Sequence, residues 1–233
     1  MKKKRFYHLP PPGVDPSKLT GVLIVIEGMD SSGRSTQIDK IAPWIEEKGY
    51  AVARVGLKRS QLVGEALDAA KRGNVLSTQT MALFYATDFY DQLENRILTA
   101  LRAGYVVLAD RYIFTLMARD IVRGVEYKWV KSLYSMAVIP EAVYYLNVSW
   151  RTRVDRTLSA QHTLDYWESG MDIGLSRDWF DSFAIYQRLM STQFRRLQQE
   201  YGFEIINANR SSDEVDRDLR SKIGELLERW YRR

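Results

Sequence analysis

The chain has 233 residues, of which 45% are hydrophobic, and it contains no cysteine. A chain of this length and composition can bury one sizeable core, and the lack of cysteine excludes a disulfide scaffold, a thiolate metal site and a cysteine nucleophile. No stretch approaches the roughly 20 apolar residues of a membrane span, and the N-terminus lacks an apolar signal core. We therefore expect a cytoplasmic enzyme without a membrane partner.

Residues 1–20 are predicted to form an arm outside the domain, which would occupy residues 21–233. Pro10-Pro-Pro-Gly13 and Pro16 disfavour helix and sheet, so we expect an extended arm, which could either wrap around a neighbour or hang free. Its basic run, Lys2-Lys-Lys-Arg5, contributes to a formal net charge of +5, which could help to attract nucleic acid. Because the arm is short and has few stacking aromatics, nucleic acid is not an expected partner, and a disordered, solubilising tail is the simpler interpretation.

The most informative stretch is the loop that follows the first apolar run. Leu23–Ile26 is typical of a buried strand, and an apolar face at helical spacing begins at Ile38. Between them, Gly28 and Gly33 fit the two glycines of the phosphate-binding pattern G-x-x-x-x-G-K-[ST]. Glycines let backbone N–H groups curl around an anion, and the helix N-terminus adds positive potential. The predicted phosphate-binding residues are Gly28, Asp30, Ser31, Ser32, Gly33, Arg34, Ser35 and Thr36.

Arg34 stands where this pattern has a lysine. Arginine keeps the positive charge, but its longer, planar fork does not simply replace a point-charge ammonium over phosphates. The loop therefore predicts phosphate binding, and catalytic competence is a separate question.

The rest of the chain alternates short apolar runs with helical patterns. Strands are predicted at 51–55, 105–109, 142–148 and 203–208, and a long helix from Ser77 to Gly104. Two later helices are predicted from their apolar stripes. The first helix ends at Gly202. The last helix has a stripe made of Val215, Leu219, Ile223, Leu226 and Trp230. This order predicts an α/β fold, a P-loop NTPase-type three-layer sandwich with about five parallel strands and helices on both faces.

Charged residues follow two of the predicted strands. Asp110 comes directly after the strand at 105–109, where a P-loop enzyme holds magnesium directly or through water. Three arginines, Arg151, Arg153 and Arg156, follow the strand at 142–148. Ligands are expected at these carboxyl ends of the strands.

Three stretches together resemble the thymidylate kinase family of nucleoside monophosphate kinases. They are residues 24–37 with the loop, residues 104–112 with the run Asp110-Arg-Tyr112, and residues 143–148 with Arg151 and Arg153 after them. The resemblance spans roughly residues 21–220 and implies ATP and Mg2+ as cofactors, a nucleotide substrate and a possible homodimer.

Carried over residue by residue, the resemblance implies specific roles. Ser35 and Asp110 would hold magnesium, and Arg111 would clamp the reacting phosphates. Asp30 would face the acceptor, and the arginines of a lid at about 150–175 would close over the transferring group. Phosphoryl transfer demands such a set because alignment and charge neutralisation accelerate it. The predicted catalytic residues are Arg34, Asp110, Arg111 and Arg153, with Arg151 on the donor nucleotide; a solvated surface position is the alternative for each lid arginine.

The acceptor side departs from the family pattern. Phe89, which also fits the core stripe of its helix, stands where the family has an arginine, and Asp120 stands where a glutamine can reach the base. A carboxylate accepts from N–H groups, so Asp120 would favour a ligand that presents them, unless it faces solvent or pairs with a neighbouring arginine. In place of the missing arginine, the acceptor phosphate could be held by Lys58, Arg59 or Arg119. The predicted substrate contacts are Asp30, Arg59, Tyr85, Phe89, Arg111, Tyr112, Arg119 and Asp120.

Three functions therefore stay open at the level of the sequence. The first is ATP- and magnesium-dependent phosphorylation of a nucleoside monophosphate, nominally dTMP to dTDP. The second is a degenerate nucleotide-binding switch or scaffold without turnover, suggested by Arg34 and by the lost acceptor arginine. The third is a kinase that uses the same donor site on a nucleoside or a non-nucleotide acceptor.

Overall fold

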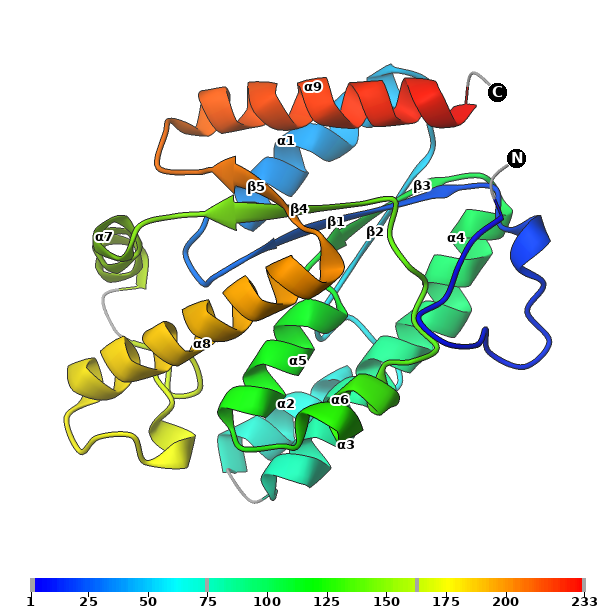
Figure 1. Cartoon of the computed structure of the whole chain (residues 1–233). Helices are drawn as coiled ribbons and strands as arrows, with labels where there is room; N and C mark the ends of the chain where they lie inside the picture. Colours follow the sequence, from blue (N-terminus) through cyan, green and yellow to red (C-terminus); the bar gives the residue numbers. More distant parts are fainter. Residues whose placement is uncertain (1–2, 74–75, 162–163, 232–233) are drawn as a thin grey trace.

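A parallel β-sheet runs through the middle of the molecule (Figure 1). The structure, a computed structural model, describes residues 3–73, 76–161 and 164–231. Within these residues the sheet has five strands in the order β2-β3-β1-β4-β5, each pair parallel. The strands are β1 (Val22–Gly28), β2 (Val52–Gly56), β3 (Val106–Asp110), β4 (Ala142–Asn147) and β5 (Glu204–Asn207). The predicted α/β fold with five parallel strands is confirmed.

The central strand, β1, is buried along its whole length. Successive side chains of a strand point to opposite faces, so a strand covered on both sides has to be apolar throughout. Ile24 and Ile26 pack on one face against α1 (Arg34–Glu47) and α9 (Ser212–Tyr231). Leu23 and Val25 pack on the other face, against the larger helical layer.

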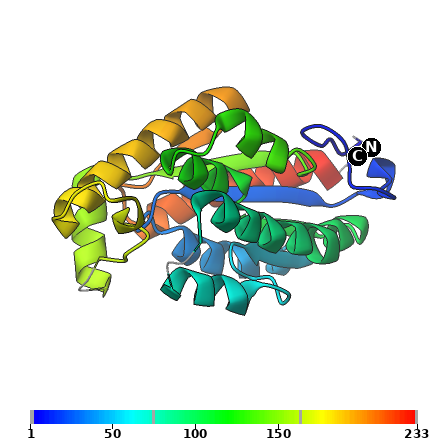
Figure 2. The ribbon, with the colours of Figure 1, turned by 90° about the horizontal axis from the view of Figure 1, so that it is seen from below.

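That larger layer contains α3 (Thr78–Gln92), α5 (Ile113–Val122) and α8 (Trp179–Tyr201), which lie next to one another across the sheet (Figure 2). The remaining helical segments are α2 (Gly64–Gly73), the π-helical η2 (Leu93–Ile97), α4 (Leu98–Arg102), α6 (Tyr127–Leu133), α7 (Trp150–Gln161), and the 3-10 turns η1 (Pro16–Lys18) and η3 (Met171–Ile173). Among the described residues, no helix is both long enough and apolar enough to cross a membrane.

Two helix predictions need correction in detail. The helix predicted from Ser77 to Gly104 begins as expected, because Ser77 Oγ accepts from the Thr80 amide, but a π-helical turn at η2 divides it into α3 and α4. The core stripe of α9 ends on Leu227 and not on Leu226, which is only partly buried. In the first helix, the extra residue of the π turn is not anticipated by a fixed 3.6-residue period. In α9, the buried residues Val215, Leu219, Ile223 and Leu227 keep a spacing of four, which places Leu227 and not Leu226 on the core face.

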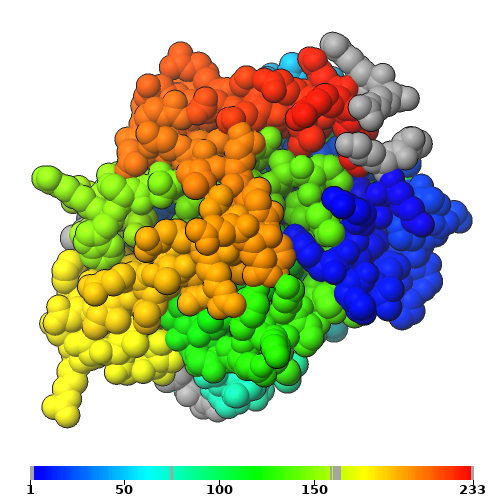
Figure 3. All heavy atoms as spheres, viewed as in Figure 1, coloured from blue at the N-terminus to red at the C-terminus, as the bar shows by residue number. Residues whose placement is uncertain are grey.

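The N-terminal arm is extended, but it is packed against the domain and is not a free tail (Figure 3, blue). Phe6 bridges Val138 in antiparallel fashion and is buried. The ammonium of Lys4 is buried and forms an ion pair with Glu141, and it lies 4.7 Å from the ring centre of Trp230. The interpretation of the arm as a disordered tail is therefore wrong for the described residues, because apolar and paired charged side chains anchor it.

Candidate active site

The loop between β1 and α1 has the conformation that an anion-binding nest requires. Ser31 has a φ of 59°, and Gly33, the N-cap of α1, has a φ of 89°. Left-handed residues of this kind turn neighbouring N–H groups toward a common point, next to the positive end of the helix. At Gly28 a Cβ atom would lie 2.6 Å from Ser32 Oγ and 3.1 Å from the Leu146 carbonyl oxygen, so a larger residue would displace Ser32 within the loop.

Arg34 is folded back into this loop. Its Nη1 donates to the carbonyl oxygens of Gly28 (2.5 Å) and Met29 (2.6 Å) and to Ser32 Oγ (3.1 Å). Its Nε donates to Asp110 Oδ1 at 3.2 Å. An ammonium, which is a single nitrogen, could not bridge the loop carbonyls and Asp110 in the same way. Arg34 therefore ties the loop to the end of β3.

Ser35 and Asp110 stand together at the ends of neighbouring elements. The register of the sheet pairs Ile26 of β1 with Asp110 of β3, so the loop after β1 meets the carboxylate directly. Ser35 Oγ donates to Asp110 Oδ2 at 2.9 Å. A hydroxyl next to a carboxylate, at the foot of an anion-binding loop, offers the oxygen ligands that Mg2+ prefers.

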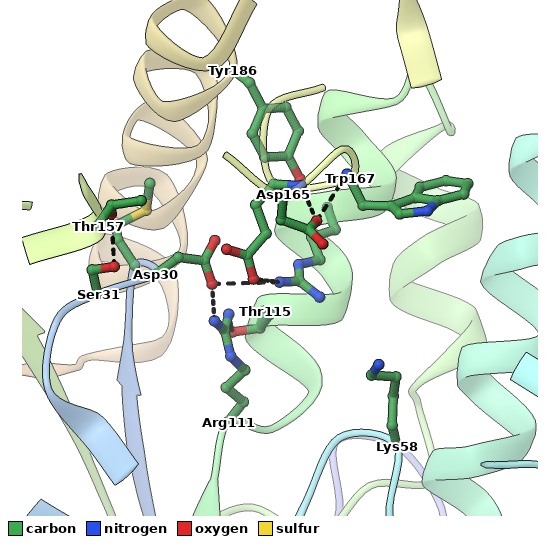
Figure 4. Close-up of polar contacts among 12 residues, drawn as sticks. Asp30, Ser31, Lys58, Arg111, Thr115, Thr157, Asp165, Trp167 and Tyr186 are labelled. Atoms are coloured by element: carbon green, nitrogen blue, oxygen red, sulfur yellow. Dashed lines mark hydrogen bonds and ion pairs between the residues drawn. The ribbon is translucent and has the colours of Figure 1, made fainter. Parts of the chain in front are cut away.

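Asp30 and Arg111 (Figure 4) form a largely buried charge cluster beside the loop, together with Arg119. The carboxylate of Asp30 pairs with Arg111 and lies 3.6 Å from Nη2 of Arg119, which is 4.0 Å from Glu168 Oε1. Burial would raise the pKa of Asp30, but the charges of Arg111 and Arg119 hold that pKa below its ordinary range. Burial and the charge of Asp30 together raise the pKa of Glu168 to about 7.

A cleft of about 310 Å³ opens beside this cluster. Seven of its lining residues are Arg or Lys and four are Asp or Glu, so the cleft favours an anionic ligand. It brings together eight of the predicted site residues: Arg34, Ser35, Arg59, Tyr85, Asp110, Arg111, Arg119 and Asp120.

The basic loop after β2 forms one edge of the cleft. Asp88 on α3 is fully buried and accepts from the backbone amides of Lys58 (2.9 Å) and Ser60 (2.8 Å), which fixes the loop. The Lys58 ammonium pairs with Asp68 at 2.7 Å, and Arg59 Nη2 lies 4.0 Å from Asp110 Oδ2.

Trp167, in the segment between α7 and α8, forms the opposite wall. Its indole N–H donates to the Lys71 carbonyl at 3.2 Å, and Lys71 and Arg123 each place a cation 5.7 Å from its ring centre. Burial lowers the pKa of Lys71 to about 8, and the nearby charges of Arg119 and Lys58 act in the same direction. No carboxylate pairs with Lys71 within 4.0 Å in the described part of the chain, so its charge is available to an anion in the cleft.

Asp120 lines the cleft with an unsatisfied oxygen. The residue is 5% exposed, and its Oδ2 has no hydrogen-bond partner among the described residues. Burial raises the pKa of Asp120 to about 7, although the charges of Arg123 and Arg119 oppose the shift. Neither a solvent-facing position nor a close ion pair with these arginines is seen. A buried acceptor without a partner is costly unless a ligand supplies the donor.

The three arginines that follow β4 lie on α7 and differ in their surroundings. Arg151 is exposed, whereas Arg153 is buried and donates to Gln187 Oε1 at 2.5 Å. Arg156 donates to the Ala208 carbonyl at 3.2 Å, and its Nη1 lies 3.9 Å from the position of a Cβ on Gly33. The hydroxyls of Thr157 and Ser31 are hydrogen-bonded at 2.7 Å, so α7 contacts the loop directly.

Two predicted substrate contacts lie in the core and not in the cleft lining. Phe89 is 4% exposed and packs against the rings of Tyr90, Tyr112 and Tyr134. Tyr112 is 2% exposed, and its hydroxyl donates to the Val138 carbonyl at 3.0 Å. Both side chains belong to the core and are in contact with each other.

Sequence reasoning gave no role to Lys71, Asp88, Trp167 or Glu168. Asp88 had one available signal, since a charged residue on the buried side of a helix usually has a specific partner. The other three lie on α2 and on the segment before α8, and only the tertiary fold brings these to the cleft.

The fold and the site together define a P-loop phosphotransferase: a parallel sheet with an anion-binding loop at the carboxyl end of β1, and an aspartate at the same edge on β3. The family model described as thymidylate kinase matches residues 26–219.

Similar proteins extend over nearly the whole chain. A probable thymidylate kinase 2 of Saccharolobus solfataricus is 35% identical over 90% of this chain and 99% of its own length. A probable thymidylate kinase of Thermococcus gammatolerans is 27% identical, covering 85% and 94%. A thymidylate kinase of Caldicellulosiruptor saccharolyticus is 29% identical, covering 91% and 100%. The chain belongs to the thymidylate kinase family, as a divergent member, and is a nucleoside monophosphate kinase.

Proposed function

We propose that the protein transfers the γ-phosphoryl group of ATP to dTMP in a magnesium-dependent reaction. An oxygen of the dTMP phosphate attacks the γ-phosphorus, the bond from that phosphorus to the β–γ bridging oxygen breaks, and ADP leaves with the electron pair. The products are dTDP and ADP. The observation that carries the proposal is the anion-binding loop joined to a cation-lined cleft at Asp110 and Arg111.

On the donor side, the loop from Gly28 to Thr36 would hold the ATP phosphates with its backbone amides. Arg156 approaches the loop at Gly33, and Arg153 has a buried Nε without a partner among the described residues. Arg151 and Arg153 would join this set when a nucleotide is bound. Cations that flank the loop neutralise charge on the moving group, which is the main source of rate in this chemistry.

The oxygen ligands present fit magnesium. Within the described residues no group of three or more His, Cys, Asp or Glu could form a complete metal site. Mg2+ usually takes only one or two protein ligands and completes its shell with phosphates and water. Ser35 Oγ and the Asp110 carboxylate, 2.9 Å apart, would supply them. The ion would neutralise charge on the phosphates.

On the acceptor side, the thymine N3–H is a donor that Asp120 Oδ2 can accept, which would satisfy the orphaned oxygen. Arg59, Lys58 and Arg119 would hold the acceptor phosphate, with Arg111 between it and the donor, and Tyr85 would line the base pocket. Asp30 would orient Arg111 and Arg119 through its ion pairs with both.

The test is ADP release from ATP with magnesium, run with dTMP, dUMP, dCMP, dGMP and dAMP. We expect turnover with dTMP and a steep loss with dCMP, whose N3 offers no hydrogen to Asp120. Preference for another monophosphate would contradict the assignment of dTMP and make Asp120 the first residue to mutate.

The switch or scaffold function is favoured by one observation, the attachment of Arg34 to its own loop carbonyls. It predicts ATP binding without turnover on any acceptor, and no recovery in Arg34→Lys. Turnover by the wild type would exclude it.

The expected cytoplasmic location and the possible homodimer stay predictions. Cell fractionation tests the first, and a sedimentation mass of two chains would support the second.

A further inference from the structure

Arg111 has a backbone conformation that residues other than glycine rarely adopt. Its φ is 69°, and it stands between β3 and the N-cap of α5. Such strain persists only where surrounding bonds hold it, and it is common at functional sites. Two consecutive residues of β1 supply these bonds: the Ile26 carbonyl accepts from the Arg111 amide at 3.1 Å, and Glu27 accepts from the Tyr112 amide at 2.9 Å.

Glu27 is the one acidic side chain in the apolar run of β1, and it is 0% exposed. Besides Tyr112, its Oε1 accepts from the Thr115 amide at 3.2 Å, and its Oε2 accepts from Thr115 Oγ1 at 2.6 Å. The carboxylate thus replaces the missing N-cap side chain of α5, since Tyr112 makes no such bond. A buried carboxylate is costly unless donors surround it, and here three do so.

The same carboxylate acts on the guanidinium of Arg111 through Thr115. Because the Thr115 hydroxyl donates its proton to Glu27, its oxygen is free to accept from Arg111 Nη1, at 3.4 Å. The other nitrogen, Nη2, pairs with Asp30 (Figure 4). The guanidinium is therefore held at both ends.

We propose that Glu27 is a positioning residue for Arg111. It holds the left-handed backbone through Tyr112, and it aims the guanidinium into the cleft through the direction of the Thr115 hydroxyl. Glu27 itself does not line the cleft. Its effect on rate rests on the proposed kinase function; its effect on the geometry of Arg111 does not.

The principal variant is Glu27→Gln, which keeps size and one acceptor oxygen. Its amide N–H2 would face Thr115, whose hydroxyl would turn and lose its orientation toward Arg111. We expect kcat with dTMP to fall by about 30-fold, with less than about a threefold change in the KM of ATP. Thr115→Val, which lacks the hydroxyl, should also lower kcat. Thr115→Ser, which keeps the hydroxyl, should have nearly the kcat of the wild type. In an Arg111→Lys background, Glu27→Gln should cost little further kcat.

Glu141→Gln is the matched control. Glu141 is also largely buried, and it accepts from the Leu23 amide at 2.7 Å, at the start of β1 and away from the cleft. This control should lower the melting temperature and leave kcat and KM unchanged. An unchanged kcat in Glu27→Gln, a loss that adds to that of Arg111→Lys, or equal kcat losses in both glutamine variants would overturn the proposal.

A second readout does not depend on turnover. The guanidinium protons of Arg111, assigned by NMR against Arg111→Lys, should exchange slowly with solvent in the wild type and faster in Glu27→Gln. Unchanged exchange would overturn the positioning role. If exchange is slow in the wild type but the protein phosphorylates no monophosphate, the proposed kinase function is wrong and the positioning role of Glu27 is not affected.

Discussion

Asp120 should make the stability of the protein fall as the pH rises. Burial raises its pKa from the ordinary 3.8 to about 7, so between these values the folded state binds a proton that the unfolded state has lost. The contribution of this proton to the free energy of unfolding is fully present below the pKa of Asp120 in the unfolded state, and it is lost as the pH rises through the pKa of Asp120 in the folded state. From pH 5 to pH 7, at about 1.36 kcal/mol per pH unit, it amounts to about 3 kcal/mol.

The perturbation is Asp120→Asn, a neutral residue of the same shape. The assay is urea unfolding of both proteins at pH 5 and pH 8, with the difference in unfolding free energy compared between the two pH values. Other titrating groups cancel in that comparison. We expect the wild type to lose about 3 kcal/mol relative to the variant between pH 5 and pH 8. Parallel pH dependence of the two proteins would refute the burial of the Asp120 carboxyl, whose Oδ2 has no partner among the described residues.

Three further changes test other parts of the structure. Lys71→Met should raise the KM of dTMP about fivefold, because the cleft loses a cation. The KM of the wild type should rise as the pH passes 8, where Lys71 loses its charge. A wild-type KM that does not change with pH would contradict the role of Lys71 in binding the substrate. Arg34→Lys should lower the melting temperature, because it breaks bonds to the loop carbonyls, yet its kcat should stay within about tenfold of the wild type. The kcat of Arg34→Ala should fall by more than about 100-fold. Equal kcat in Arg34→Ala and the wild type would contradict a role for the Arg34 charge in catalysis. Lys4→Met leaves Glu141 buried and unpaired and should destabilise the fold by about 3 kcal/mol in urea unfolding, a loss that a free tail would not show.

The sequence was sufficient for the sheet because its strands are short, apolar and separated by helices. Buried parallel strands have to be apolar on both faces, and this pattern is visible without tertiary information. The extended arm was predicted, but its packing against the domain was not, for a different reason. Lys4 is typical of a solvated tail until Glu141 lies beside it, more than a hundred residues later in the chain.

The candidate site likewise has a part that the local sequence predicted and a part that it did not. The loop from Gly28 to Thr36 and Asp110 follow strands directly, so the parallel sheet alone brings them together. The acceptor cleft is assembled from α2, α3, α5 and the segment before α8, and no local pattern specifies that arrangement. Phe89 is an example. The family pattern placed it at a substrate-binding position, and the helical spacing placed it in a core stripe. In the structure it is buried and packs against Tyr112, as the core stripe predicted.

Formation of dTDP from dTMP and ATP tests the central claim most directly. The two diphosphates would be separated by anion exchange and measured together, with magnesium and again with excess chelator. We predict equal amounts of dTDP and ADP, formed only with magnesium and dTMP both present. ATP binding without diphosphate formation from any nucleoside monophosphate would contradict the account.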